Sequence, residues 1–271
     1  MQPVVLSIAG FDPSGGAGVL ADLKTFSALG VYGMACVTAL TVQSTQGVRR
    51  VESLAPDIVV ETLDCLAGDV SFAAIKVGML GSAAVAAAVA QWLGRRPELT
   101  VVLDPVLKSS SGKDLLDEPG REVLRDTWLA RAGWITPNLP ELGALTGLPE
   151  PENAAETVTC AQHLREMAAR RANPGLKIVV TGGHAQTPDD LLLSSENCRW
   201  FPGKRIETSS THGTGCTFSS ALAARIALGD NEIDAVAAAK QYVTGALLHA
   251  VSLGRGTGPL GHFWSKTSGP A

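Results

Sequence analysis

The chain has 271 residues, of which 45% are hydrophobic, 18% charged and 5% aromatic. A chain of this length and composition can bury a sizeable core without disulfide or metal support, which excludes a disordered protein. Its 26 acidic and 22 basic residues give a net charge of -4, which argues against a broad nucleic-acid surface.

Membrane insertion and secretion are not expected either. The longest apolar stretch, residues 83–90, is far shorter than the ~20 residues that cross a bilayer. The N-terminus shows no basic segment followed by a cleavage site, and the five cysteines have no Cys-x-x-Cys spacing. The five histidines show no zinc pattern. We therefore expect a cytoplasmic protein with reduced thiols and no membrane partner.

Short β-branched or apolar runs alternate along the chain with segments of helical period. In chain order, the expected elements are a strand at 4–9, a helix through 20–29 that stops at Gly30, a strand at 35–42, a helix at 58–66, a strand at 74–77, a helix at 83–93, a strand at 100–103, a helix at 123–129, a strand at 134–136, a helix at 154–169, a strand at 177–181, and helices at 217–228 and 233–253. This alternation predicts an α/β fold with a mainly parallel sheet and helices on both faces.

One interruption breaks the alternation. Residues 190–193 and 198–201 flank a polar turn, which predicts an antiparallel hairpin, and we expect it at the edge of the sheet. No repeat, low-complexity tract or long linker divides the chain, so residues 1–271 are expected to form one domain, with a loosely held tail at 265–271.

The strongest chemical signal is the run Thr-His-Gly-Thr-Gly-Cys-Thr at 211–217, which leads into an apolar helix. Gly213 and Gly215 allow backbone N–H groups to turn toward a ligand, and a helix N-terminus favours a phosphate or an oxyanion. Cys216 would lie in the first helical turn, where a thiol pKa of about 8.5 is normally lowered, so it is a candidate base. A small buried thiol beside a tight turn is the alternative.

A second glycine-rich junction, residues 10–18, joins the first strand to the first helix, and Asp22 follows in that helix. It lets the chain wrap closely around a small ligand. A tight turn with an N-capping Ser14 would look similar, and the run fits neither a P-loop nor Gly-x-Gly-x-x-Gly.

Acidic and amide side chains follow two further strands. Asp104, Asn138 and Glu141 could hold Mg²⁺ through water and orient a triphosphate. Helix capping by Asn138, with Glu141 in the first turn, is the alternative and is favoured when these residues are taken alone.

Polar side chains also follow the second and sixth strands. Gln43, expected just after the strand, could present its carboxamide to a ring nitrogen and an adjacent amino group, although a solvated loop residue is equally consistent. His184 and His212 are interpreted as loop histidines, because they lack the spacing of metal ligands.

Together these motifs resemble the ribokinase-like family, and within it the hydroxymethylpyrimidine/phosphomethylpyrimidine kinases of thiamine biosynthesis. The matching segments span essentially the whole chain and are residues 9–18, 21–25, 42–45, 76–80, 104–106, 136–141, 182–184, 211–217 and 258–260. The resemblance implies a ribokinase-like three-layer sandwich, a homodimer, and ATP- and Mg²⁺-dependent phosphorylation. The substrates would be 4-amino-5-hydroxymethyl-2-methylpyrimidine and then its monophosphate.

The resemblance also implies roles for individual residues. Substrate contacts are implied for Gly10, Ala17, Asp22, Gln43, Met79 and Val106. Contacts with ATP or phosphate are implied for Asn138, Thr181, Gly183 and Thr214, and metal contacts for Asp104 and Glu141. Gly213 and Gly215 would form the anion hole, and Cys216 would stand where most ribokinase-like enzymes carry an aspartate as base.

Two departures and two alternatives accompany the resemblance. Relatives often carry a lysine where this chain has Thr181, so a phosphate contact would be missing or supplied by Lys108 or Lys113. Relatives also tend to have histidines where this chain has Arg255 and Thr257. A pyridoxal kinase on the same scaffold is the nearest alternative function, and a non-catalytic pyrimidine-binding protein is another.

Overall fold

The computed structural model describes residues 2–109, 112–183 and 187–267. Its strands form one sheet in the order β3-β2-β1-β4-β5-β6-β7-β8-β9. The strands are β1 (Val4–Phe11), β2 (Tyr32–Ser44), β3 (Gly47–Ser53), β4 (Ala74–Val77), β5 (Val101–Leu103), β6 (Trp134–Ile135), β7 (Lys177–Val180), β8 (Asp190–Leu193) and β9 (Cys198–Phe201). Six neighbouring strands of this sheet, β2, β1, β4, β5, β6 and β7, pair in parallel. The predicted mainly parallel sheet is therefore confirmed.

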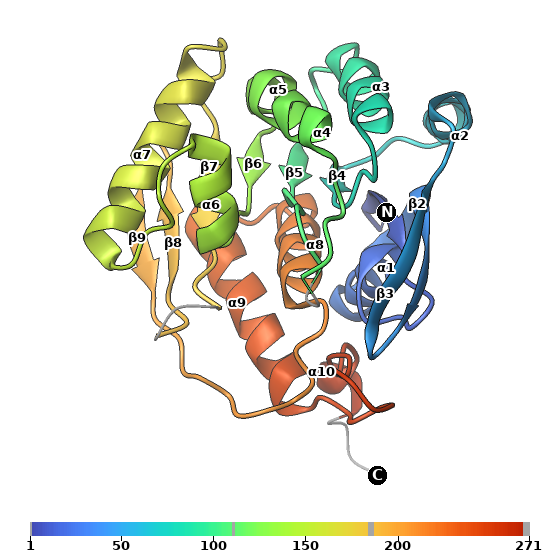
Figure 1. The fold of residues 1–271 in the computed structure, drawn as a ribbon, viewed down its shortest axis with the longest axis vertical. Coiled ribbons are helices and arrows are strands. Elements are labelled where there is room, and N and C mark those ends of the chain that lie inside the picture. Colours follow the sequence, from blue (N-terminus) through green and yellow to red (C-terminus); the bar gives the residue numbers. More distant parts are fainter. Residues whose placement is uncertain (1, 110–111, 184–186, 268–271) are drawn as a thin grey trace.

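Helices cover both faces of this sheet (Figure 1). They are α1 (Gly18–Leu29), α2 (Pro56–Asp69), α3 (Ala83–Gly94), α4 (Glu118–Val123), the π-helical turn η1 (Leu124–Trp128), α5 (Leu129–Arg131), α6 (Leu139–Thr146), α7 (Ala154–Ala169), α8 (Thr214–Ala227), α9 (Glu232–Leu248) and α10 (Trp264–Thr267). The three-layer arrangement predicted from the sequence is therefore observed.

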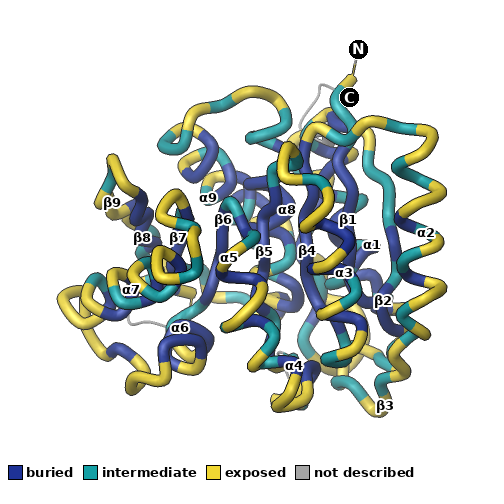
Figure 2. The backbone as a smooth tube through the Cα atoms, turned by 90° about the horizontal axis from the view of Figure 1, so that it is seen from above, coloured by how far each residue is buried: buried dark blue, intermediate teal, exposed yellow. Residues whose placement is uncertain are grey.

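The two faces of the sheet belong to two hydrophobic clusters, because successive strand residues point to opposite sides. In β5, Val101 and Leu103 pack in one cluster with α2, α3 and α7, whereas Val102 packs in the other with α1, α8 and α9. Figure 2 shows the central strands buried between these layers. A strand buried on both faces reads as a continuous apolar run, which explains why the sequence located these strands well.

Several boundaries follow from recognisable caps. Helix α1 ends at Gly30, whose φ of 82° is left-handed, as the sequence predicted.

The hairpin β8-β9 lies at the sheet edge with the expected bounds. Helix α9 is shorter than expected, since it ends at Leu248 and the chain turns at His249.

The opposite edge holds a hairpin that the sequence reading missed. Strand β2 continues to Ser44 and pairs antiparallel with β3, so Gln43 lies within a strand rather than after it. Of the expected loose tail, Ser265 belongs to α10, and 268–271 lie outside the described residues. His184 also lies outside them.

Candidate active site

The carboxyl ends of the parallel strands gather most of the predicted site residues at one edge of the sheet. In such folds ligands bind in the crevice outside these strand ends. Asp12, Met79 and Asp104 follow β1, β4 and β5, and Asn138 and Thr181 follow β6 and β7. The edge therefore carries carboxylates, an amide and a hydroxyl at the ends of four strands, and a thioether at the end of the fifth.

Helix α8 begins at this edge, where the sequence predicts an anion-binding site. Gly213 is its N-cap with φ of 82°, and a Cβ there would lie 1.9 Å from the Gly16 carbonyl oxygen, so only glycine fits. A Cβ at Gly215 would meet no atom within 4 Å, so this position faces open space. The Thr214 N–H donates to the Thr211 carbonyl at 3.4 Å, so an anion would be bound by the next N–H groups of the first turn, beside Gly215.

Cys216 lies in the first turn of α8, but its thiol differs from the sequence expectation. Burial raises the pKa of Cys216 to about 12; the Lys76 ammonium and the Gly18 N–H lower it, and the carboxyls of Asp104 and Asp22 raise it further. The predicted lowering of the pKa is therefore wrong for this structure, because desolvation and two acidic neighbours outweigh Lys76 and the Gly18 N–H. The thiol is protonated at neutral pH.

A buried ion pair beneath Cys216 was missed by the sequence analysis. Lys76 and Asp22 are fully buried, and the Lys76 Nζ lies 2.9 Å from both Asp22 oxygens. Ser7 and Ser220 donate to the same carboxylate at 2.6 and 2.7 Å. Asp22 therefore lies in a buried polar network, and its substrate contact stays a prediction. Burial would lower the pKa of Lys76, but Asp22 raises it, so the amine is charged.

Lys76 showed one weak signal in the sequence. It is a lysine inside the apolar run 74–77, and an odd charge in a buried strand needs a partner. Its partner is 54 residues away on α1, a distance that no local spacing reveals.

Asp104 and Glu141 form a buried acidic pair. Burial, followed by the charge of Asp104, raises the pKa of Glu141 to about 8, and backbone hydrogen bonds from Asn138 and Leu107 oppose this shift. Burial also raises the pKa of Asp104, against the effects of Lys76 and of a hydrogen bond from Ser219. The capping interpretation is confirmed, because the Asn138 N–H donates to Glu141 and the Glu141 N–H donates to Asn138.

Gln43 and His212 line a cavity of about 120 Å³ together with residues of the β2-β3 turn and Thr257. The Gln43 amide lies 3.0 Å from His212 Nε2, which in turn lies 2.8 Å from Asp12 Oδ2. His212 therefore lies in the loop before α8, as interpreted, and it is buried and hydrogen-bonded there. Burial would raise the pKa of Asp12, but hydrogen bonds from His212 and Ser14 lower it.

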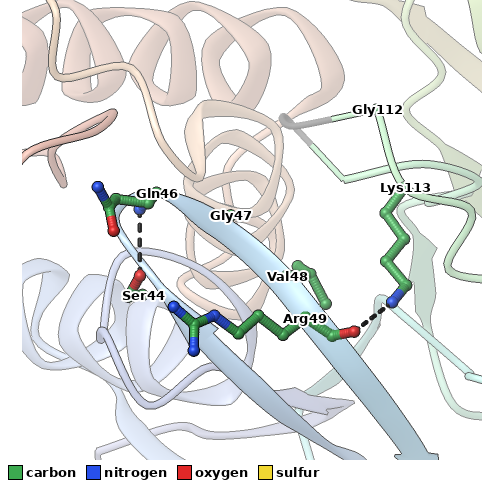
Figure 3. A pocket seen from close by; sticks show the side chains of 7 residues that line it. All are labelled: Ser44, Gln46, Gly47, Val48, Arg49, Gly112 and Lys113. Atoms are coloured by element: carbon green, nitrogen blue, oxygen red, sulfur yellow. Dashed lines mark hydrogen bonds between the residues drawn. The ribbon is translucent and has the colours of Figure 1, made fainter.

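A larger cavity of about 430 Å³ adjoins the first and shares Ser44, Gln46, Gly47 and Val48 with it. Figure 3 shows that it is flanked by Arg49 and by Lys113, whose Nζ donates to the Arg49 carbonyl at 2.6 Å. Relatives often carry a lysine at the position of Thr181, and Lys113 was considered as its substitute. Lys113 therefore lies beside the Gln43 cavity.

The remaining expected substrate residues surround β1 and β4. Met79 is buried and packs with Val106, and it lies against Gly10. Ala17 is the N-cap of α1, and its N–H donates to Asp12 at 2.9 Å. These side chains are apolar or small, as a wall against a flat ring requires.

The expected phosphate residues fall at two places. Asn138 and Thr181 are joined by a β-bridge at the ends of β6 and β7. Gly183 is exposed nearby, and the Gly182 N–H is held by Asp190, which pairs with Lys240 at 2.9 Å. Thr214 lies at the N-terminus of α8. Within residues 2–109, 112–183 and 187–267, no group of three or more His, Cys, Asp or Glu side chains could hold a metal, and no helix is long and apolar enough to cross a membrane.

Comparison with known proteins agrees with this geometry. The profile of the family described as "Phosphomethylpyrimidine kinase" matches residues 12–261. A hydroxymethylpyrimidine/phosphomethylpyrimidine kinase of Escherichia coli (strain K12) is 42% identical over 263 residues, covering 95% of this chain and 96% of the relative.

Solved structures give the same result. A phosphomethylpyrimidine kinase from Clostridium difficile 630 has a TM-score of 0.80 and 33% identity, covering 91% of this chain and 100% of its own. A Bacillus subtilis pyridoxal kinase in complex with ADP has a TM-score of 0.88 and 29% identity, covering 99% and 100%. The chain therefore belongs to the phosphomethylpyrimidine kinase family of ribokinase-like phosphotransferases.

Proposed function

We propose that this enzyme transfers the γ-phosphoryl group of ATP to the hydroxymethyl oxygen of 4-amino-5-hydroxymethyl-2-methylpyrimidine, and then phosphorylates the monophosphate to the pyrophosphate in thiamine biosynthesis. The observation that carries this proposal is that the open N-terminus of α8 and the Gln43 cavity lie at the same edge of the sheet. A hydroxyl acceptor and a phosphoryl donor could meet there.

The transfer forms a bond between the hydroxymethyl oxygen and the γ-phosphorus, and it breaks the bond to the bridging oxygen of ADP. Charge spreads over the oxygens of the transferred group, so positioning and charge stabilisation supply most of the rate. The N–H groups at Gly213 and Gly215 would stabilise this charge, and Asn138, Thr181, Gly183 and Thr214 would contact ATP.

Cys216 is proposed to accept the hydroxyl proton. Its thiol is protonated in the unliganded protein, so it must first release this proton to water before the thiolate can accept the hydroxyl proton. The Lys76 ammonium beneath it stabilises the thiolate by its charge. General-base assistance of this kind contributes about 10²- to 10⁴-fold to a rate.

Mg²⁺ is proposed as the metal partner of ATP. Asp104 and Glu141 are the proposed ligands, and a nearby divalent cation would stabilise their ionised forms against the burial that raises both pKa values. This donor set fits an ion that takes few carboxylates and keeps its waters. When bound, the ion would neutralise charge on the phosphates.

Three further proposals concern the whole chain: residues 1–271 act as one domain, the protein is cytoplasmic, and it forms a homodimer. The dimer is supported by Leu40 and Val42 of β2, which are 47% and 48% exposed. A molar mass measured by light scattering tests it, and a monomer at micromolar concentration would contradict it.

The function is tested by steady-state kinetics with the hydroxymethylpyrimidine and pyridoxal in parallel. The relationship to pyridoxal kinases makes pyridoxal the natural competitor. We expect kcat/KM to favour the pyrimidine, because a carboxamide at Gln43 suits an aminopyrimidine edge better than a pyridine with a phenolic oxygen. A preference for pyridoxal would contradict the proposal, and binding of the pyrimidine without ATP turnover would indicate a non-catalytic protein.

A further inference from the structure

His212 connects two segments that are far apart in sequence. It precedes α8, and its ring lies against Gly16, where a Cβ would come within 2.4 Å of His212 Cδ2. Its backbone N–H donates to the Gly258 carbonyl at 3.1 Å. The ring is therefore held from the β1-α1 loop on one side and by its own backbone on the other. The position of its Nε2, between Asp12 and Gln43, is fixed by the fold.

The protons around Nε2 can be counted. Asp12 accepts hydrogen bonds from the Ser14 and Ala17 N–H groups, so its carboxyl is an ionised acceptor. With Asp12 Oδ2 at 2.8 Å, Nε2 must carry a proton, whether the imidazole is neutral or charged. A ring N–H cannot face an amide NH₂ as a hydrogen-bond partner. The two ends of a carboxamide have nearly the same shape, and the proton count therefore turns the Gln43 oxygen toward His212.

The other end of the carboxamide leads independently to the same orientation. Thr41 lies two residues before Gln43 in β2, and its Oγ1 is 3.0 Å from the Phe11 carbonyl oxygen. A carbonyl only accepts, so the single hydroxyl proton of Thr41 goes to Phe11. The Thr41 oxygen also lies 3.2 Å from the amide end placed as Gln43 Oε1, but its proton is already donated to Phe11, so Thr41 can only accept a hydrogen bond from that end. The Gln43 NH₂ therefore faces Thr41.

We propose that His212 and Thr41 are positioning residues that lock the Gln43 carboxamide with its oxygen on the His212 side and its NH₂ on the Thr41 side. The locked amide offers the cavity one acceptor and one donor in a fixed order. The amide oxygen on the His212 side accepts from a donor of the ligand, and the amide NH₂ on the Thr41 side donates to an adjacent acceptor. The amide therefore selects a ring edge on which a donor and an acceptor are neighbours in this order. The role of this selection in catalysis rests on the proposed pyrimidine substrate.

An aminopyrimidine has this edge, because its exocyclic amino group donates and the neighbouring ring nitrogen accepts. The 4-oxo analogue of the same compound reverses both, with a carbonyl acceptor and a ring N–H donor. A freely turning glutamine would serve either edge. The locked one rejects the oxo analogue, since two buried polar groups of the ligand would remain unpaired.

The orientation is measured directly on the wild-type protein, without substrate, by NMR of the Gln43 side-chain NH₂, assigned with the Gln43→Leu variant. Nuclear Overhauser contacts from the NH₂ to the Thr41 methyl group support the proposal. Contacts to the His212 ring protons, or equal contacts to both residues, overturn it. Because this test needs no turnover, its result stands even if the proposed enzymatic function fails.

The consequence for selection is measured as the ratio of kcat/KM for the amino substrate to that for its 4-oxo analogue. His212→Phe keeps an aromatic ring but removes the donor, and Thr41→Val keeps the shape but removes the hydroxyl. Each variant should lower this ratio. For His212→Phe we expect a fall of about tenfold, since the loss of one hydrogen bond that discriminates between the two substrates changes their relative kcat/KM by roughly one order of magnitude. His249→Phe, a ring stacked on Trp264, is the control and should leave the ratio unchanged.

A purely structural role for His212 would lower the activity on both substrates equally. An unchanged ratio in folded His212→Phe therefore overturns the proposal. If His212→Phe does not fold, Thr41→Val and the NMR contacts decide. If neither compound is phosphorylated by the wild-type protein, the proposed function fails and the NMR contacts alone test the locked orientation.

Discussion

Replacing Lys76 by methionine should destabilise the protein severely. The ammonium is fully buried and contacts both oxygens of Asp22 at 2.9 Å, so the substitution leaves a buried carboxylate whose remaining partners are the hydroxyls of Ser7 and Ser220. Removing one partner of such a pair costs about 3 to 5 kcal/mol in the free energy of unfolding. That is a large part of the stability of an ordinary domain.

The assay is equilibrium unfolding in urea, followed for Lys76→Met, Asp22→Asn and the double variant. Each single change strands one buried charge, whereas the double change removes both, so the double variant should be more stable than additivity predicts by about 2 kcal/mol or more. Lys177→Met is the matched control, because Lys177 and Glu232 are 31% and 25% exposed and 3.6 Å apart. It should cost about 1 kcal/mol or less. A loss below about 1 kcal/mol for Lys76→Met, or an additive cycle, would refute the reasoning.

Four further predictions concern the site and its surroundings. Gln43→Leu should lower kcat/KM for the pyrimidine by about tenfold or more and leave the KM for ATP unchanged, since it leaves ligand polar groups unpaired; an unaltered kcat/KM would exclude Gln43 from the pocket. Glu141→Gln can keep the cap but cannot ionise when a cation binds, so it should raise the Mg²⁺ concentration for half-maximal activity with little change in Tm; lost stability with an unchanged Mg²⁺ requirement would leave Glu141 as a cap only. Cys216→Ser should lower kcat by about 10²-fold while substrate binding persists, and near-wild-type turnover would leave the anion hole to carry catalysis alone. Burial, with a smaller effect of a nearby lysine, lowers the pKa of His262 from 6.5 to about 4. Between these two pH values the unfolded chain binds a proton at His262 and the folded protein does not. Stability should therefore fall by about 3 kcal/mol between pH 7 and pH 4 on this account, and His262→Asn should flatten that part of the profile in urea titrations; an equally steep profile in the variant would contradict it.

The fold was predictable where local chemistry decides it. Strand β4 and helix α7 have the bounds expected from the sequence, because an apolar run and a helical period of apolar residues define them. Strand β3 was missed, since most of its residues are exposed or half-buried and two arginines interrupt any alternation. An edge strand paired on one side needs no apolar run, so its sequence carries little signal.

The position of the candidate residues at one edge of the sheet was predictable, but their charges were not, and their roles stay predictions. The glycines at the start of α8 and the polar residues after the strands indicated the correct edge of the sheet. The pKa of Cys216 could not be inferred, because it depends on Lys76, Asp104 and Asp22, which come from three other elements. The contact of His212 with Asp12 joins residues 200 positions apart, and only the folded chain shows it.

The most direct measurement is mass spectrometry of the products formed from the hydroxymethylpyrimidine, ATP and Mg²⁺. The monophosphate should appear first and then be converted to the pyrophosphate, with ADP formed in step with each transfer. Accumulation of the monophosphate alone would limit the enzyme to the first transfer. Unchanged pyrimidine, in a protein that binds it, would contradict the central claim that this site is a pyrimidine kinase.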